Sequence, residues 1–572
     1  MNYRTIFKLL NSIVLILICN LNSYSQIKNI IVPEGKYFID NYNKIILCTE
    51  KISSLGNIDE AEEINIVFDK NYKIKGSPDF FSYSESYDLE ITDEGRSQFK
   101  LFFTQLPVFT INTKGEVVDD PKVGGYLTYS DSTGILLKSD IGIEIRGNWS
   151  QTFPKKTYDL EFWADETGKE TIDAKFGNLR SDDDWVLDAL YNEPLRINSY
   201  TAHKLWLDIH TLYYAGKAPK AKSGADVSYA ELFLNGKYHG LYMLSEQIDR
   251  KQLDLKKTIG AKVEGELIKG DNWGDAVTFI KANPFDNNSQ TWDGFEMKYP
   301  DEFINWENIH AFVDFVVNSR DEEFKSSIFK RFAIDNAIDY FIFINLLGAS
   351  DNTGKNIFIC KYKSGEPYFY TPWDLDGTYG TLWDGSRQYT ATFELTNGLY
   401  ERLFKLNPNQ FIEKLISRWT ELRLSKFSNV SLAEGLDRSY NLLKGNNIYE
   451  REGIVWKEYK FSINDSTFMK SWINTRLQFM DGYVSTLTGA IETSIKNSSV
   501  VSTIYPIPAS DFITIDFNGL DGTEFLIVNL QGVVQKKGQL DAGKNLFKTT
   551  DFENGIYFVV IGNTFQKISI IK

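Results

Sequence analysis

Cysteine and histidine are scarce in this 572-residue chain, and basic side chains are fewer than acidic ones. Of the three cysteines, only Cys48 and Cys360 lie outside the N-terminal leader, and they are too few and too far apart for a disulfide framework or a cysteine-rich zinc site. The four histidines form no His-Glu-x-x-His pattern, which argues against a zinc protease. With 62 basic against 77 acidic side chains, the net charge is −15 and no Lys/Arg cluster offsets it, so nucleic acid is not expected as a partner.

The N-terminal segment also lacks an apolar run long enough for a membrane span. It has two basic residues among its first eight, an apolar stretch over residues 9–19, and Ser-Tyr-Ser before Gln26. The apolar stretch is shorter than the roughly 20 residues that cross a bilayer. This order predicts a signal peptide over residues 1–25 and no transmembrane anchor in the mature protein. A membrane anchor and lipid attachment at Cys19 are the alternatives, but Cys19 follows an isoleucine where the lipoprotein pattern has a small residue.

What the chain does have is length and aromatic residues. At roughly 100–200 residues per domain the chain allows about three to four units, and the 15% aromatic content with many alternating segments favours strands. Residues 26–105 read as a small β-rich domain. Residues 106–490 have a strand-rich first half and a helical second half, which is an α+β pattern. A polar linker over 491–499 then leads to a small β-sandwich over 500–572. Helices are expected from about residue 196 and over 306–318, 327–347, 408–424, 429–444 and 466–488.

A β-hairpin is predicted in the middle of the chain. Two apolar runs, 231–234 and 237–244, flank Asn235-Gly236. An Asn-Gly pair between apolar runs is the strongest short-range signal for a hairpin.

An acidic loop carries the most informative chemistry. Asp351 and Asn356 follow a long apolar helix with the Asp-x-x-x-x-Asn spacing of a protein-kinase catalytic loop, although an Asx-capped turn would look similar. Two strands and a Ser-Gly-Glu-Pro turn come next, over 357–371, and then Pro-Trp-Asp-Leu-Asp with Asp374 and Asp376. A hairpin would return these acids to Asn356. Phosphoryl transfer needs such a set, because Mg²⁺ prefers carboxylate and amide oxygens and a separate carboxylate orients the attacking hydroxyl.

A basic loop lies upstream. An Arg-Gly-Asn turn begins at Arg146, and Phe-Pro-Lys-Lys with Lys155 and Lys156 opens the next strand. Fixed positive charge beside a glycine turn suits a triphosphate. A surface loop with two solvated lysines is the alternative.

Taken together, these blocks resemble the CotH kinase family, named for spore coat protein H, over about 106–490 and in the family's order. The blocks are Arg-Gly-Asn…Pro-Lys-Lys (146–156), Glu-Leu-Phe-Leu-Asn-Gly to Glu-Gln-Ile-Asp (231–249), Asp351…Asn356 and Pro-Trp-Asp-Leu-Asp (372–376). The resemblance implies a two-lobed atypical protein-kinase-like core that uses ATP and Mg²⁺ (or Mn²⁺). It also implies transfer of the γ-phosphoryl group to a hydroxyl, Ser or Thr, of a secreted or surface protein.

The resemblance also implies roles for the acidic residues. Asp351 is the expected catalytic acid. Asn356 and Asp374 are expected metal ligands, with Asp376 as a second acid of the same turn, and the choice between Asp374 and Asp376 stays open.

On the nucleotide side, Lys156 or its neighbour Lys155 is the expected phosphate-pairing lysine, with Lys156 also counted as catalytic. Arg146 is expected in the phosphate loop. Glu246 and Gln247 occupy the place of a kinase hinge that holds the base.

Departures from the kinase pattern leave a second function class open. No complete Gly-x-Gly-x-x-Gly loop is present, no His-Arg precedes Asp351, and Asp-Leu-Asp replaces Asp-Phe-Gly. The acidic partner of Lys156 is open between Asp188 and Glu193. A catalytically silent surface adhesin or binding protein on the same fold is therefore the alternative.

A glycan-active enzyme is the third interpretation. Asp374 and Asp376 lie beside Trp373, Tyr379 and Trp383, which would suit an aromatic sugar subsite. Acids two residues apart on one strand are, however, poorly placed to flank a scissile bond from opposite sides.

The last segment resembles the type A sorting domain of the type IX secretion system over its full length. It has Tyr505-Pro506-Ile507-Pro508 at its start, a Gln531-Gly532 turn and a Gly-Ile-Tyr strand before a lysine-containing end, with Ile507 where asparagine is usual. The resemblance implies handling by the type IX machinery after Sec export, removal of this domain, and a secreted or cell-surface location. A generic adhesive sandwich is the alternative.

Overall fold

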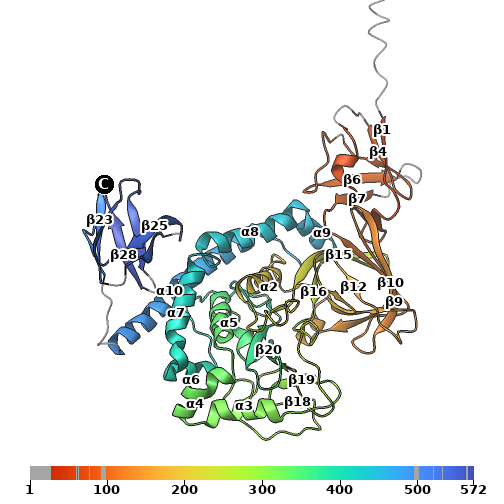
Figure 1. The fold of residues 1–572 in the computed structure, drawn as a ribbon. Helices are drawn as coiled ribbons and strands as arrows, with labels where there is room; N and C mark the ends of the chain where they lie inside the picture. Colours follow the sequence, from red (N-terminus) through yellow and green to blue (C-terminus); the bar gives the residue numbers. More distant parts are fainter. Residues whose placement is uncertain are drawn as a thin grey trace, which may run out of the picture. The chain divides into compact units, whose positions relative to one another are not determined.

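The computed structural model describes residues 27–58, 61, 63–76, 78–91, 98–494, 502–518, 521–530, 532–561 and 564–572. The expected signal peptide lies outside the described residues. The chain divides into two compact units, and Figure 1 labels many of their helices and strands. Unit 1 comprises the chain up to Ala174, Tyr229–Tyr242 and Leu442–Tyr459; unit 2 comprises Lys175–Ser228, Met243–Asn441 and Lys460–Lys572.

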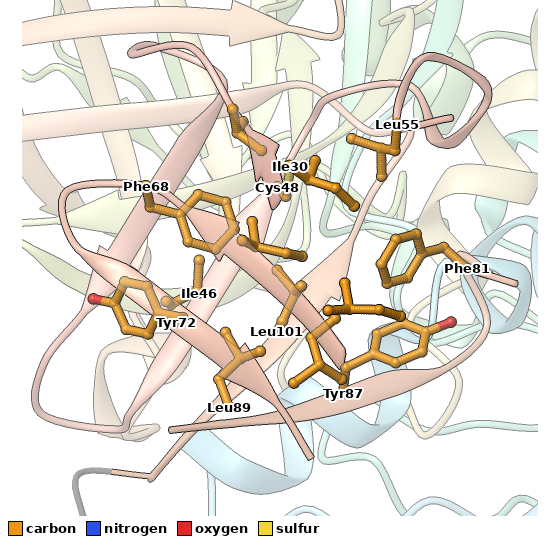
Figure 2. Close-up of a cluster of buried hydrophobic side chains, with 14 of the residues drawn as sticks. Ile30, Ile46, Cys48, Leu55, Phe68, Tyr72, Phe81, Tyr87, Leu89 and Leu101 are labelled. Carbon is orange, nitrogen blue, oxygen red and sulfur yellow. The ribbon is translucent and has the colours of Figure 1, made fainter. Parts of the chain in front are cut away.

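Unit 1 begins with a seven-stranded sheet in the order β1-β4-β5-β6-β7-β3-β2. Its strands are β1 (Ile27–Ile31), β2 (Tyr37–Asp40), β3 (Ile45–Cys48), β4 (Glu63–Val67), β5 (Asn71–Ile74), β6 (Ser86–Ile91) and β7 (Gln98–Phe103), with a short 3-10 helix η1 (Ile52–Ser54). Alternate residues of β3 point to opposite faces, as strand geometry requires. Ile46 and Cys48 enter the domain's own core, which Figure 2 shows with Leu89 and Leu101, whereas Ile45 and Leu47 join a second cluster on the other face.

The remaining strands of unit 1 continue the β structure. They are β8 (Val108–Thr113), β9 (Val123–Asp131), β10 (Gly134–Arg146), β11 (Thr157–Trp163), most of β15 (Val227–Leu234) and the first part of β16 (Lys237–Glu246). β9 pairs with β8 and β10, β10 pairs with β11, and β15 runs parallel to β8. The 3-10 helix η2 (Trp149–Thr152) and helix α9 (Ile448–Val455) complete the unit.

The predicted hairpin is present between β15 and β16. Asn235 and Gly236 have φ values of 52° and 73°. Positive φ at both central residues is the geometry of the tight turns that suit the twist of paired strands. The sequence therefore determines this register locally.

Unit 2 contains a five-stranded sheet in the order β18-β19-β17-β20-β21. Its strands are β17 (Glu266–Gly270), β18 (Thr291–Trp292), β19 (Phe295–Tyr299), β20 (Ile357–Lys361) and β21 (Tyr368–Pro372). β14 (Asp184–Asp188) pairs with the second part of β16. Two short strands, β12 (Ala174–Lys175) and β13 (Ser181–Asp182), lie near the start of the unit.

The helices of unit 2 match most of the expected ranges. They are α2 (Asn198–Ile209), α3 (Glu307–Asn318), α4 (Asp321–Ser327), α5 (Ile334–Leu347), α6 (Gly398–Leu406), α7 (Phe411–Arg423), α8 (Asn429–Gly445) and α10 (Ile463–Ser494), with η3 (Ile328–Lys330), η4 (Ser350–Thr353) and η5 (Pro408–Gln410). The expected helix over 327–347 is interrupted, because Phe332 forms a β-bridge with Tyr368 and Ala333 donates its N–H to Tyr368 before α5 begins. No helix in the described part of the chain is both long and apolar enough to cross a membrane.

The C-terminal segment is a small two-sheet β structure with its own core. One sheet has the order β22-β23-β26 and the other β25-β24-β27-β28. The strands are β22 (Thr503–Tyr505), β23 (Phe512–Phe517), β24 (Thr523–Asn529), β25 (Val534–Leu540), β26 (Gly543–Lys548), β27 (Gly555–Ile561) and β28 (Thr564–Ile570). Ile515 of the first sheet and Ile527 of the second belong to one buried cluster.

The chain thus has the mixed α and β content that the sequence predicts. The two-lobed, kinase-like arrangement of its core stays a prediction.

Candidate active site

A hairpin brings the two predicted metal-binding segments together in unit 2. β20 and β21 pair antiparallel, and the last pair in register is Ile357 with Pro372. Asn356 directly precedes the first strand and Asp374 follows the second by two residues, so both lie at the same end of the hairpin. The N–H of Trp373 donates to the carbonyl of Asn356 over 3.1 Å, which closes that end.

Both residues have an unusual backbone conformation. Asn356 has φ 54° and Asp374 has φ 52°. Left-handed backbone is rare outside glycine, although Asn and Asp tolerate it best, and such strain is common where a side chain must be aimed. Asn352 holds the two segments in place, because its Nδ2 donates to the carbonyls of Asn356 (2.7 Å) and Trp373 (2.8 Å).

Asp351 lies on the short helix η4, just after α5. Gly348, with φ 67°, ends α5 in a left-handed cap, and the Tyr340 hydroxyl donates to the carbonyl of Asn352 over 2.8 Å. Asp351 is half-buried, and burial raises the pKa of its carboxyl group, while the charge of Lys355 opposes that rise. The carboxylate of Asp351 is therefore a stronger base than usual, and the end of α5 and the Tyr340 hydrogen bond hold its loop in place.

Four carboxyl groups influence one another here, and we call Asp188, Asp351, Asp374 and Asp376 the acidic cluster. Solvent reaches Asp374, yet protein atoms crowd its carboxyl group. Burial therefore raises the pKa of Asp374 to about 6, helped by Asp188 and Asp351 and opposed by Lys269. Burial also raises the pKa of Asp376 well above its usual value, with Asp374 as the next cause. The repulsion between these negative charges contributes to both shifts, and a cation would relieve it.

The hydrogen bonds distinguish the two acids of the Asp-Leu-Asp turn. Asp376 accepts from Asn192 Nδ2 through Oδ2 and from the N–H of Gly377 (2.7 Å) through Oδ1. Among the described residues, no hydrogen-bond partner is found for the side chains of Asp351, Asn356 or Asp374. These three offer oxygen atoms of the type that Mg²⁺ or Mn²⁺ prefers, so the donor set fits a hard divalent cation.

The basic loop lies in unit 1, where its three cations have different surroundings. Arg146 is half-buried and contacts Asp159 at 3.3 Å. Lys156 is also half-buried, and its Nζ donates to the carbonyls of Gln151 and Phe153, both at 2.6 Å. Lys156 is thus held by its own loop.

Lys155 is the lysine with a buried acidic partner. Its Nζ contacts Glu452 Oε1 of α9 at 2.9 Å, and both side chains are 0% exposed. The same Nζ donates to the carbonyl of Leu241 (2.5 Å) and lies over the Tyr242 ring, and the N–H of Leu241 donates to Glu452 (2.8 Å). Gly240 is required beside this pair, because a Cβ there would come within 2.0 Å of Glu452 Oε1.

Sequence reasoning missed Glu452. It lies on an eight-residue helix, too short for a periodic apolar pattern, and 297 positions from Lys155. The local signal is a run of three charged residues, Glu450-Arg451-Glu452, in a helix whose ends are apolar.

The two acids proposed as lysine partners lie in unit 2 and have other contacts. Glu193 is buried and accepts the N–H groups of Asn198 (2.7 Å) and Ser199 (2.9 Å), which satisfies the start of α2. Asp188 belongs to the acidic cluster and accepts the N–H of Leu190 at 3.1 Å.

Glu246, predicted at the nucleotide base, has a fully occupied carboxylate. Its two oxygens accept from Arg180 N (2.6 Å), Lys222 Nζ (2.6 Å), Asp226 N (3.1 Å) and Gln252 Nε2 (2.8 Å). A carboxylate has about four acceptor positions, so this side chain has none left for a ligand. The neighbouring Gln247 is half-buried, and its carbonyl accepts from Arg180 Nη2 at 3.4 Å.

The aromatic residues near Asp376 do not form an exposed platform together. Tyr379 is only 1% exposed, whereas Trp383 is 43% exposed. A sugar subsite built from both rings therefore lacks support.

Comparison with known proteins shows which family the chain belongs to. Residues 143–480, more than half of the chain, match the model of the family described as CotH kinase protein. The chain belongs to the CotH kinase protein family. It is also 23% identical over 279 residues to the inner spore coat protein H of Bacillus subtilis (strain 168), covering 48% of this chain and 67% of that protein. The CotH match extends from before Arg146 to beyond Glu452, so it includes every site residue discussed above.

A second match covers the end of the chain. Residues 503–572 match the model described as secretion system C-terminal sorting domain. This CotH-family protein therefore carries a sorting domain of the kind that type IX secretion handles, which confirms the resemblance seen in the sequence.

Proposed function

We propose that this CotH-family protein is an exported atypical protein kinase. It transfers the γ-phosphoryl group of ATP, with Mg²⁺ (or Mn²⁺), to a Ser or Thr hydroxyl of a secreted or surface protein. The carrying observation is the β20–β21 hairpin, which places Asn356 and Asp374 at one end beside the Asp351 loop. Asn356 and Asp374 have strained backbone and offer oxygen ligands within or near the acidic cluster. A surface that only binds another protein has no physical need for this arrangement.

The acidic residues take distinct roles in this proposal. Asp351 accepts a hydrogen bond from the acceptor hydroxyl and orients its oxygen for attack. Asn356 and Asp374 would hold the metal ion, which would neutralise phosphate charge. Asp376 is assigned a supporting role, because each of its oxygens already accepts one hydrogen bond, from Asn192 or from Gly377.

The basic residues act on the phosphates. Lys155 with Glu452 corresponds to the strand lysine and helix glutamate that protein kinases need in place. Lys156 and Arg146, both half-buried on the same loop, supply additional positive charge for the phosphates. Glu246 acts as a structural support rather than a base-binding side chain.

Metal binding should depend on pH through Asp374. Since its pKa is raised to about 6, the carboxyl group is protonated below that value and ionised above it. A metal ligand must be deprotonated, so Mn²⁺ affinity should be constant above about pH 7 and fall by up to about tenfold per unit below pH 6. Electron paramagnetic resonance titration of free Mn²⁺ measures this. Asp374→Asn should bind weakly without that pH dependence, and an unchanged wild-type affinity down to about pH 5 would refute the assignment.

Export should remove a segment from each end of the chain. The signal-like start and the sorting domain predict a mature protein that begins near Gln26 and lacks the C-terminal β domain. Mass spectrometry of the secreted form should find no peptides from the segment before Gln26 and none from the C-terminal β domain. Peptides from 510–572 in that form, or normal export of a chain ending at Ser499, would contradict this prediction.

The rival function is a catalytically silent binding protein on the same fold. The burial of Lys155 and the occupied carboxylate of Glu246 are the features that favour it. Metal-dependent ATP binding separates the two, because only the kinase requires it.

A further inference from the structure

Helix α9 carries two buried charged residues in succession, and each forms an ion pair with a different part of unit 1. Glu452 contacts Lys155 as described. Arg451 contacts Glu231 of β15 through Nη2 (2.9 Å) and Nε (3.1 Å), and both of these side chains are also 0% exposed. The position of α9 therefore determines whether Lys155 has its partner.

The N-terminal β domain contacts this same arrangement through polar groups. Thr104, directly after β7, donates to Glu231 Oε1 over 2.5 Å. Glu450 of α9 accepts from Ser86 Oγ (3.0 Å) and contacts Lys100 Nζ (3.4 Å). The domain thus reaches α9 directly and also reaches the glutamate that holds Arg451.

Apolar contacts cover the same face. The Arg451 guanidinium lies over the Phe102 ring of β7 at 5.2 Å from its centre. One buried cluster joins residues of the N-terminal sheet, of β8, of the β15–β16 hairpin and of α9. Its buried members are Ile45, Leu47, Phe102, Val108, Phe233 and Tyr238, and the partly buried Phe38, Ile454 and Val455 pack against them.

The N-terminal sheet is therefore apolar on both faces, which a free-standing accessory domain does not require. One face forms the domain's own core with Leu89 and Leu101 (Figure 2). The other face packs against α9 and the hairpin. A short helix of eight residues has little stability by itself, so its order depends on such packing.

We propose that the N-terminal β domain, residues 27–103, is a brace that fixes helix α9 and thereby keeps Glu452 paired with Lys155. The domain acts on α9 through two residues of that helix: Arg451 is the main positioning residue, and Glu450 is the second. The consequence for ATP rests on the proposed kinase function, whereas the mechanical link does not.

Two leucine variants of the full mature chain test the link. Leu47→Ala removes side-chain volume from the face that packs on α9, and Leu101→Ala removes the same atoms from the opposite face. Hydrogen–deuterium exchange of the amides of residues 448–455 is the readout. Leu47→Ala should speed their exchange about tenfold or more, because part of the packing loss reaches the helix. Leu101→Ala should leave their exchange within about twofold, even though it weakens the domain itself. Equal protection of α9 in both variants overturns the brace.

A milder pair guards against misfolding of the leucine variants. Lys100→Met removes the cation beside Glu450, and Lys75→Met removes a comparable cation that contacts Glu90 elsewhere on the sheet at 2.9 Å. Lys100→Met should speed α9 exchange about twofold to threefold, and Lys75→Met should not. The same exchange for both lysine variants also counts against the proposal.

Measurements of ATP turnover then test the brace and the kinase proposal independently of each other. If the wild type transfers phosphate, Leu47→Ala should raise the KM for ATP about threefold or more, while Leu101→Ala leaves it unchanged. A wild type without ATP turnover refutes the kinase, yet the exchange results still decide the brace.

Discussion

Asp351→Asn should lower phosphotransfer by about 10²- to 10⁴-fold while ATP binding stays within about twofold of wild type, because the lost carboxylate orients the acceptor hydroxyl and holds no nucleotide. Asp374→Asn should lose transfer as well, and it should also lose the metal-dependent part of ATP binding. Steady-state transfer from γ-labelled ATP and calorimetric ATP titration, each with and without Mg²⁺, measure the two effects.

The exposed Asp301, which lies outside the acidic cluster, provides the matched control. Asp301→Asn makes the same chemical change and should leave both measurements as in the wild type. If Asp351→Asn transfers phosphate at the wild-type rate, the role given to Asp351 is wrong even where the fold is right.

Lys155→Met should destabilise the protein by about 3–5 kcal/mol, because it leaves the buried charge of Glu452 without a partner. Lys156→Met should destabilise the protein much less, since its half-buried ammonium group donates to two loop carbonyls and has no acidic partner among the described residues. Denaturant unfolding, followed at the transition that includes unit 1, compares the two variants directly.

A double variant isolates the ion pair from simple packing loss. Lys155→Met with Glu452→Gln removes both charges but keeps an amide oxygen to accept the N–H of Leu241. It should recover most of the stability that Lys155→Met loses, because no uncompensated charge stays buried. If the double variant is as unstable as the sum of its single changes, the two residues do not act as a pair.

Local signals in the sequence predicted the elements that support the site. The Asn235-Gly236 turn fixed one hairpin by its backbone preference, and two apolar runs around a Ser-Gly-Glu-Pro turn predicted the β20–β21 hairpin. Because a hairpin returns the chain to its start, the proximity of Asn356 and Asp374 followed from pairing alone. Asn356 and Asp374 lie at the ends of two strands that are neighbours in the sequence, and the register of such a hairpin is determined locally.

The choice between Lys155 and Lys156 could not be made from the sequence. β11 alternates with Tyr158 buried, and by that pattern Lys156 would point inward and Lys155 outward. The strand begins only at Thr157, so the alternation does not extend to either lysine. The burial of Lys155 depends on Glu452, which approaches from a distant part of the chain and leaves no periodic trace.

Glu246 shows a different limit. Its place in a motif block predicted a ligand-binding role, but side chains and backbone groups from four other positions occupy its carboxylate. A motif preserves residues that build a site as well as residues that touch its ligand. Only the hydrogen bonds in the structure distinguish a residue that builds the site from one that contacts the ligand.

Metal-dependent ATP binding by the purified mature protein distinguishes a kinase from a catalytically silent binding protein. A thermal unfolding scan with ATP, with ATP plus Mg²⁺ or Mn²⁺, and with metal alone gives the answer without knowledge of the acceptor. At ligand about 100-fold above its dissociation constant, binding adds about 2.7 kcal/mol of stability, so the combination of ATP and metal should raise the Tm by several degrees. Asp374→Asn should abolish most of that rise. A wild-type Tm that ATP and metal together do not change would contradict the kinase proposal and favour the silent binding protein.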